Sequence, residues 1–222
     1  MSNKKPRGKV RDNKRKLEKR KNNMRKLLMA KVNKDKIIKY DDPVLLKLCR
    51  DVSPTDDLSF IKDMKEILKT SNKGVGLAAS QIGILKRAII IDPLKNKNYV
   101  VMLNAEYLPV KEKSLKNPQS EPRVKAYETE EGCLSYPGFY VKISRPRKIE
   151  VRYYDENMKL HVEEFEDFRS ILIQHEIDHT FGICKVGDAW KKKQEKMKKL
   201  TQRSRVEQEE LVDIVKNEQN TL

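Results

Sequence analysis

Two of the three histidines lie four residues apart in the stretch QHEIDHTFG, residues 174–182. On a helix this spacing places His175 and His179 on one face, where both side chains can bind a single metal ion. Glu176 directly follows the first histidine and can reach a water at the metal without being a ligand itself. Two nitrogens leave a catalytic site incomplete, because such a site usually has a third protein ligand and one open position.

The third ligand could come from either side of this helix. Downstream there is no further histidine, and the nearest acids are Asp188 and Glu195, the latter within a basic run. Upstream, EGCLSYPG (131–138) contains Cys133, whose thiolate would complete a His₂Cys site with water as fourth ligand. A lone cysteine is more often a small buried residue, and a buried helix can satisfy its histidines by hydrogen bonding. The residues alone therefore leave a metallopeptidase, a structural metal site and a His₂Cys hydrolase as alternatives.

Three separated segments together resemble the peptide deformylase family. They are GVGLAASQ (74–81), EGCLS (131–135) and QHEIDH (174–179), and they occur in the order and at the spacing of that family. The resemblance extends over about residues 37–188. It implies a metal-dependent hydrolase that removes the N-formyl group from the N-terminal methionine of newly synthesised polypeptides and releases formate.

The resemblance also implies a role for each matching residue. Glu176 would be the general base and then the general acid of formamide hydrolysis. Gln81 and the backbone N–H of Leu134 would donate hydrogen bonds to the developing oxyanion. One divalent ion would be bound, Fe²⁺ by analogy with the family, although Zn²⁺, Ni²⁺ or Co²⁺ could occupy the same site. Its ligands would be Cys133, His175 and His179.

The expected substrate-binding residues have two origins. Backbone segments matching the family motifs would line a peptide cleft, and an arginine matches a family arginine near that cleft. Apolar side chains on the metal-binding helix would form a pocket for the methionine side chain, an inference from helix position alone, and their pattern predicts deep burial. The residues of the first kind are Val75, Gly76, Gly132 and Arg145, and those of the second are Phe168, Ile171 and Leu172.

Hydrophobic periodicity predicts the elements that position these residues. Strands outnumber helices and neighbouring strands are expected to be antiparallel, which indicates an α+β fold with antiparallel sheets packed around a central helix carrying HExxH. A further helix is expected at the C-terminus. The predicted elements are an extended segment (37–54), helices (58–70, 168–182 and 190–220), strands (87–92 and 99–108), a polar surface loop (109–127) and a β-hairpin (148–155 with 159–165).

Charge divides the chain into a neutral body and basic flanks. Residues 1–36 carry 16 Lys and Arg against 3 Asp and Glu, and residues 191–205 carry 8 against 1. The remaining body, residues 37–190, has 24 of each sign and is neutral. We therefore predict a basic, disordered extension (1–36), a catalytic domain (37–190) and a charged C-terminal helix or tail (191–222).

The basic flanks suggest a polyanionic partner. A surface of RNA, and specifically the ribosome, is the predicted partner, so an RNA-binding module with a structural metal remains an alternative to the enzyme. The sequence shows no secretory signal and no apolar stretch of roughly 20 residues, so we expect no membrane association. Three scattered cysteines indicate a reducing compartment. We expect a monomer in a bacterial cytoplasm, with an organelle as the alternative location.

Overall fold

The computed structural model describes residues 15–16, 19–20, 36–40, 42–117 and 119–219. The disorder expected for residues 1–36 falls almost entirely outside this set. The four described residues of that stretch before position 36 are helical, and their side chains are exposed.

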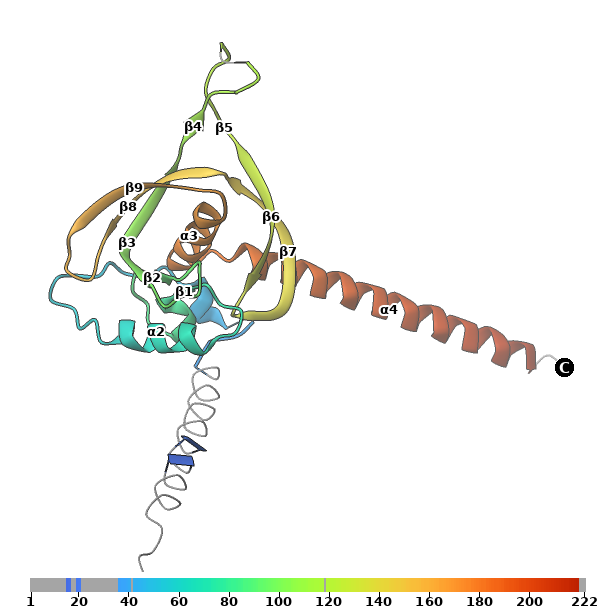
Figure 1. The fold of residues 1–222 in the computed structure, drawn as a ribbon. Helices are drawn as coiled ribbons and strands as arrows, with labels where there is room; N and C mark the ends of the chain where they lie inside the picture. Colours follow the sequence, from blue (N-terminus) through green and yellow to red (C-terminus); the bar gives the residue numbers. More distant parts are fainter. Residues whose placement is uncertain (1–14, 17–18, 21–35, 41, 118, 220–222) are drawn as a thin grey trace, which may run out of the picture.

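A five-stranded antiparallel sheet forms the centre of the body, in the order β1-β2-β3-β8-β9 (Figure 1). The two predicted strands and the predicted hairpin are all part of it. The turn of the hairpin is held by Asp155, whose side chain accepts hydrogen bonds from the backbone N–H groups of Asn157 and Lys159. The strands are β1 (Gly76–Ala78), β2 (Ala88–Ile91), β3 (Val100–Pro109), β8 (Lys148–Tyr154) and β9 (Leu160–Glu166).

Helices cover both faces of this sheet, and β2 shows why. All four residues of β2 are buried, because successive side chains point to opposite faces and each face has a helix against it. Ile90 packs in one hydrophobic cluster with Met64 of α2 (Phe60–Thr70). Ile89 packs in a second cluster with Ile173 of α3 (Asp167–Thr180). The helix α3 is therefore buried between layers.

A second, two-stranded sheet lies on the other side of α3. It consists of β6 (Ala126–Cys133) and β7 (Tyr136–Pro146), and α3 contacts β7 as well as the five-stranded sheet. Part of the predicted loop 109–127 instead forms strands β4 (Lys111–Glu112) and β5 (Arg123–Val124), which pair and project away from the body (Figure 1). The prediction of a surface loop was wrong for the residues of β4 and β5, whereas the α+β class with a central helix is confirmed.

The long helix α4 (Lys185–Gln219) begins five residues before the predicted start and extends away from the body (Figure 1). Gly182 separates it from α3 with a φ of +71°, and a Cβ there would lie 2.5 Å from the carbonyl oxygen of Leu46. Trp190 on the first turns packs against Tyr40 and Tyr136, at ring-centroid distances of 5.3 and 5.8 Å. Tyr136 of β7 and Tyr40 thus hold the first turns of α4 against the body.

The segment before α2 departs from the extended conformation predicted for residues 37–54. It includes a short 3-10 helix, η1 (Pro43–Leu46), whose first turn is capped by the carboxylate of Asp42. A second 3-10 helix, η2 (Ala79–Ile82), directly follows β1.

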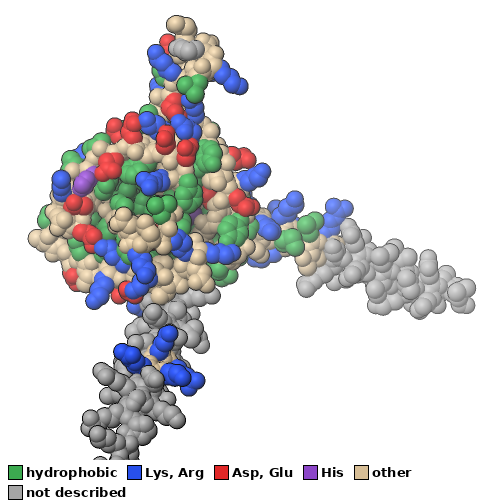
Figure 2. All heavy atoms as spheres, viewed as in Figure 1, with side chains coloured by type: hydrophobic (Ala, Val, Ile, Leu, Met, Phe, Trp, Pro, Cys, Tyr) green, Lys and Arg blue, Asp and Glu red, His purple; other side chains and the backbone are tan. Residues whose placement is uncertain are grey.

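Figure 2 shows acidic and basic side chains interspersed over the body, and basic side chains along the described start of α4. Within the residues that the structure describes, no helix is long and apolar enough to cross a bilayer.

Candidate metal centre and peptide cleft

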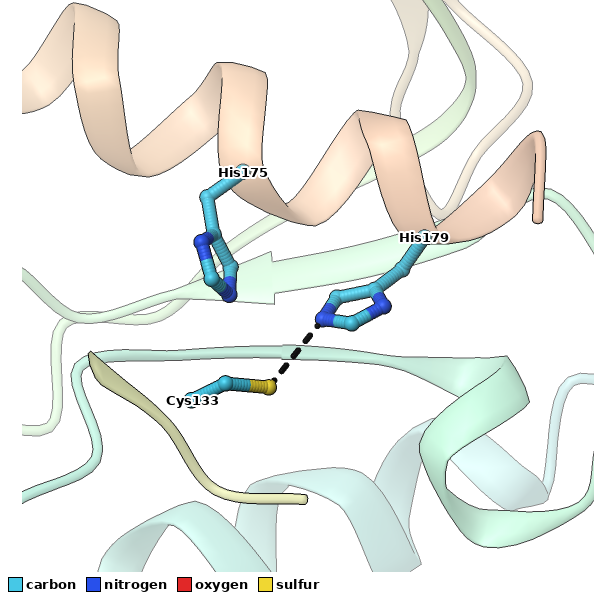
Figure 3. Close-up of side chains that lie close together, drawn as sticks. All are labelled: Cys133, His175 and His179. Carbon is cyan, nitrogen blue, oxygen red and sulfur yellow. Dashed lines mark hydrogen bonds between the residues drawn. The ribbon is translucent and has the colours of Figure 1, made fainter. Parts of the chain in front are cut away.

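Three potential metal ligands converge between α3 and the end of β6. The side chains of His175 and His179 point from one face of α3 toward Cys133 (Figure 3). One donor atom from each residue lies within 4.8 Å of the others, and the Cys133 Sγ is 3.3 Å from His179 Nε2. Asp188 and Glu195, the acids considered as third ligands, are exposed on α4 and do not belong to this cluster.

The donor set and its surroundings fit a divalent transition metal. His175 donates its Nδ1–H to Glu131 Oε2 at 2.8 Å, which leaves Nε2 as the nitrogen able to bind metal. Two imidazole nitrogens and one thiolate form a set of three protein ligands that suits such an ion. Beside them, Glu176 Oε2 is buried and has no hydrogen-bond partner among the described residues. An orphaned carboxylate oxygen at this place is suited to a polar species at the metal.

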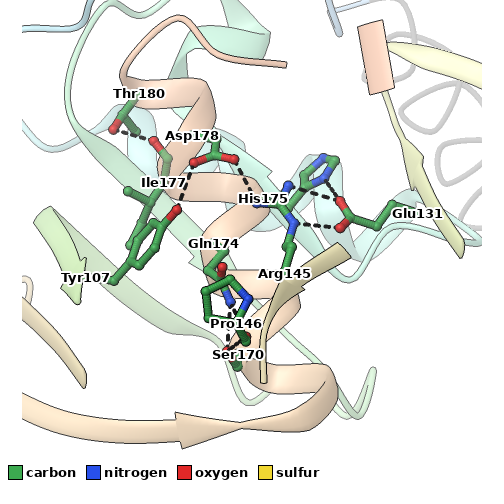
Figure 4. A network of polar contacts seen from close by, with 10 residues as sticks. All are labelled: Tyr107, Glu131, Arg145, Pro146, Ser170, Gln174, His175, Ile177, Asp178 and Thr180. Atoms are coloured by element: carbon green, nitrogen blue, oxygen red, sulfur yellow. Dashed lines mark hydrogen bonds and ion pairs between the residues drawn. The ribbon is translucent and has the colours of Figure 1, made fainter. Parts of the chain in front are cut away.

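A buried polar network lies behind the ligands and orients them (Figure 4). Arg145 on β7 donates from Nε and Nη2 to Glu131 at 2.5 and 3.1 Å, and from Nη1 to Asp178 Oδ2 at 2.7 Å. Asp178 also accepts a hydrogen bond from the Tyr107 hydroxyl at 3.3 Å. Burial alone would raise the pKa of Glu131, but its hydrogen bonds from His175 and Arg145 hold that pKa below the ordinary value. Glu131 is therefore a carboxylate fixed against the His175 ring.

The position of Arg145 corrects one expectation. We placed it among the substrate-binding residues, yet its side chain is 1% exposed and does not line the cleft. Instead, Arg145 contacts Glu131, which accepts a hydrogen bond from His175, and Asp178, which precedes His179 on α3. From these contacts we expect Arg145 to position α3 and its two histidines.

A further contact ties α3 to the end of β7. Gln174 Nε2 donates to the carbonyl oxygen of Pro146 at 2.9 Å and to Ser170 Oγ at 2.8 Å. Ser170 Oγ donates to the same carbonyl at 3.1 Å. These bonds fix the first turns of α3 relative to β7, the strand that carries Arg145. The two histidines on α3 are therefore held in position relative to the Arg145 network.

Glu176 lies at the floor of the cleft with its carboxyl fully buried. Burial raises the pKa of Glu176 to about 7, so this side chain can accept and release a proton near neutral pH. Gly76 of β1 packs directly against it. A Cβ at Gly76 would collide with Glu176 Oε1 and would lie 2.8 Å from Leu172 Cδ1. Glycine is thus required here by the closeness of the carboxylate.

On the expectation that Glu176 is the acid–base residue of a deformylase, Gly76→Ala should displace its carboxylate and lower kcat by about 100-fold, because small misplacements of a catalytic group have effects of that size. The measurement is steady-state release of formate from a formyl-methionyl peptide, together with the unfolding midpoint. Gly138→Ala is the control for a glycine that also lines the cleft but does not contact Glu176, because a Cβ there meets no atom within 4 Å although its φ of +77° makes alanine strained. Equal kcat values for both variants would contradict the role assigned to Gly76.

The two expected oxyanion donors lie beside Cys133. The Gln81 amide is oriented by the backbone N–H of Ala78, which donates to Oε1 at 2.9 Å. Its Nε2 then faces Cys133 Sγ at 3.3 Å and Ser135 Oγ at 3.2 Å. Leu134 follows the cysteine, and its carbonyl oxygen accepts a hydrogen bond from Lys39 Nζ at 2.7 Å. Both donors are held close to the metal ligands by these contacts.

A cleft of about 1010 Å³ opens above these groups. One wall of the cleft comes from β1 and the segment before it, the other from β6 and β7, and the floor from α3. Phe168 lines the mouth with 51% of its surface exposed, so the expectation of deep burial was wrong for this residue, which lies on the first turn of α3. The predicted residues that line the cleft are Val75, Gly76, Gln81, Gly132, Cys133, Leu134, Phe168, Ile171, Leu172, His175 and Glu176.

Sequence reasoning missed several residues that contact this site, among them Glu131, Asp178 and Lys39. Glu131 and Asp178 lie inside the quoted motifs, two residues before Cys133 and one before His179, so their proximity to ligands was a usable signal. Lys39 carries no such signal, because its contact with Leu134 joins residues 95 positions apart.

Comparison with known proteins gives a consistent result. A family model described as polypeptide deformylase matches residues 34–195. The peptide deformylase of Leptospira biflexa is 36% identical over 165 residues, covering 68% of this chain and 85% of that protein. The crystal structure of a peptide deformylase from Synechococcus elongatus in complex with actinonin has a TM-score of 0.57 at 30% identity, covering 67% of this chain and 76% of that one. Peptide deformylase from Plasmodium falciparum has a TM-score of 0.58 at 29% identity, covering 77% and 96%.

Proposed function

The chain belongs to the peptide deformylase family, the hydrolases that remove the N-formyl group from nascent peptides, and we propose that the cleft above α3 is where it does so. In this proposal Cys133, His175 and His179 hold the metal and Glu176 is the acid–base residue. The observation that supports it most directly is the convergence of the three donor atoms within 4.8 Å, next to a buried carboxylate.

Each step of formamide hydrolysis has a candidate group in the cleft. When bound, the metal supplies Lewis acidity and lowers the pKa of water. Glu176 accepts the proton of the attacking water and delivers it to the amide nitrogen as the C–N bond breaks, so the products are formate and a free amine. Its pKa of about 7 suits both directions of transfer.

Two donors would meet the negative charge that develops on the formyl oxygen. The Leu134 N–H is one, and Gln81 Nε2 is the other, turning from its present contacts with Cys133 and Ser135. One such donor can lower a barrier by about 2.7–4 kcal/mol. The peptide backbone would extend along Val75, Gly76 and Gly132, and its methionine side chain would contact Phe168, Ile171 and Leu172, all of which line the cleft.

Removing the thiolate tests the proposed metal site. Cys133→Ala should bind metal much more weakly than wild type, because two imidazoles alone form an incomplete site. Metal content after dialysis against a competing chelator is the measurement, and formate release should fall with it. Cys49→Ala is the control, because Cys49 is also a buried free cysteine but is not part of the ligand cluster. Full metal retention by Cys133→Ala would favour a metallopeptidase-type ligand set.

The identity of the metal is a separate proposal. We propose Fe²⁺ on the family resemblance, and the His₂Cys set also accommodates Zn²⁺, Ni²⁺ or Co²⁺. Loading the metal-free protein with each ion in the absence of oxygen, and comparing kcat/KM, distinguishes them. Greater activity with Zn²⁺ than with Fe²⁺ would overturn the assignment.

We also propose how the chain is organised and where it acts. Residues 37–190 would form the catalytic domain, flanked by a basic extension (1–36) and a charged C-terminal helix (191–222), in a monomer that acts in the bacterial cytoplasm. The buried, free state of all three cysteines is consistent with a reducing compartment.

The basic side chains of α4 support docking on the ribosome. Lys191, Lys196 and Lys198 are among the described basic residues on its first half, and residues 191–205 carry 8 Lys and Arg against 1 Glu. Full-length protein should co-sediment with ribosomes at low salt and be released at high salt, as expected for binding to phosphates. A 37–190 variant should not co-sediment. Equal, salt-insensitive binding by both would contradict the proposal.

A further inference from the structure

The mouth of the cleft carries an excess of lysine side chains. Lys39 and Lys73 line the cleft directly. Lys193 of α4 lies with its Nζ 5.5 Å from the ring centroid of Phe139, which also lines it. These three residues come from three separate segments of the chain: the segment before η1, the segment between α2 and β1, and α4.

The Lys73 side chain reaches from the segment before β1 to Tyr140 of β7, and both residues line the cleft. Its Nζ lies 3.5 Å from the Tyr140 hydroxyl and 5.7 Å from the centroid of that ring. Lys193 similarly lies over an aromatic ring. Within the described part of the chain, neither Lys73 nor Lys193 forms an ion pair with a carboxylate. Contacts with aromatic rings position these ammonium groups but leave their charge uncompensated.

The acidic residues of the cleft do not balance this charge. Glu131 is buried and already bound to Arg145 and His175, and Glu176 is buried at the floor. Only Glu130, among the described acidic residues that line the cleft, is exposed at the mouth. The mouth is therefore positive at neutral pH, whereas the body as a whole, residues 37–190, is neutral.

We propose that this lysine mouth makes the enzyme prefer formylated peptides with Asp or Glu in the first few positions after methionine, with Lys73 as the main determinant. This inference rests on the proposed function. The formyl end must reach the floor, so the residues after methionine pass through the mouth. A carboxylate there gains from the nearby ammonium groups, and a Lys or Arg side chain is repelled.

The expected effect is modest and depends on salt. Exposed ion pairs have small effects. At about 0.02 M salt, a peptide with Asp should therefore have a kcat/KM about fivefold higher than the same peptide with Lys. At about 0.5 M salt the difference should largely disappear, because charges in solvent are then screened. Most of the effect should appear in KM, since the charged groups are remote from the reacting bond.

The test compares formate release from formyl-Met peptides that carry Asp, Asn or Lys at the second or the third position. Wild type should show Asp above Asn above Lys. Lys73→Gln should flatten this order and Lys73→Glu should reverse it, judged by the ratio of Asp to Lys peptides within each variant. Lys159→Glu is the matched control, because it changes net charge equally on an exposed turn that does not line the cleft.

The outcomes separate this inference from the proposed function. Equal kcat/KM for the three peptides, or an unchanged ratio in Lys73→Glu, would overturn the charge preference while leaving deformylation intact. Failure of wild type to release formate from the neutral Asn peptide would overturn the proposed function, and this inference with it.

Discussion

Glu176→Gln is expected to reduce formate release by about 1000-fold or more while leaving the bound metal in place. Glutamine keeps the size of the side chain but cannot take a proton from water, and acid–base residues commonly contribute 10²–10⁴-fold. The proposed metal-binding atoms come from Cys133, His175 and His179, so replacing the Glu176 carboxylate removes no metal ligand. The measurements are kcat for a formyl-methionyl peptide and metal content of the same preparation.

Glu195→Gln is the matched control for this experiment. Glu195 is exposed on α4 and was the alternative third ligand, so the same change there should affect neither metal content nor kcat. A Glu176→Gln variant with more than about a tenth of wild-type activity would exclude Glu176 as the acid–base residue. Full activity in that variant would favour a structural metal and an RNA-binding role.

Arg145→Met is expected to destabilise the fold by about 3–5 kcal/mol, the usual effect of removing one partner from a buried ion pair. Arg145 neutralises two buried carboxylates at once, Glu131 and Asp178, and its own side chain is 1% exposed. Without it both acids remain buried and lose the cation that neutralises them. The free energy of unfolding from urea titration, measured with and without metal, is the observable.

The same variant should bind metal more weakly. With Arg145 absent, Glu131 is free to turn from the His175 ring, and the loss of such an orienting partner typically lowers metal affinity 10–100-fold. Arg147→Met, two residues along, is the control. Arg147 pairs with Glu112, Glu166 and Asp167 at the surface, so its removal should leave metal affinity unchanged. Equal losses in both variants would contradict a specific role for Arg145.

The elements predicted well from the sequence are those with one clear periodicity. The helix α2 and the strand β8 each alternate buried and exposed positions at their own spacing, so the apolar pattern specifies them. The pair β6–β7 does not, because six of the eight residues of β6 are not buried and its sequence reads as polar. Its stability comes from pairing along the hairpin and from packing at one end, neither of which is a local signal.

The residues of the candidate site likewise fall into those that a local sequence pattern predicts and those that it does not. The metal ligands and Glu176 lie in short motifs whose spacing on a helix or strand already has chemical meaning. The contact of Arg145 with Asp178 joins residues 33 positions apart on different elements, and only the packing of β7 behind α3 brings them together. Phe168 was misjudged for a related reason. An apolar residue on the first turn of a buried helix can face an open cleft, and periodicity does not distinguish the two.

The length of α4 has a consequence for timing. Its 35 residues span about 52 Å at 1.5 Å per residue. Its first turns are held against β7 by the contact of Trp190 with Tyr136. The basic stretch that would contact the ribosome, residues 191–205, ends about 30 Å along the helix. A growing chain emerging beside the far end of that stretch would need about nine extended residues to bring its first residue to Glu176. The helix would then act as a ruler that sets the earliest nascent-chain length at which deformylation can begin.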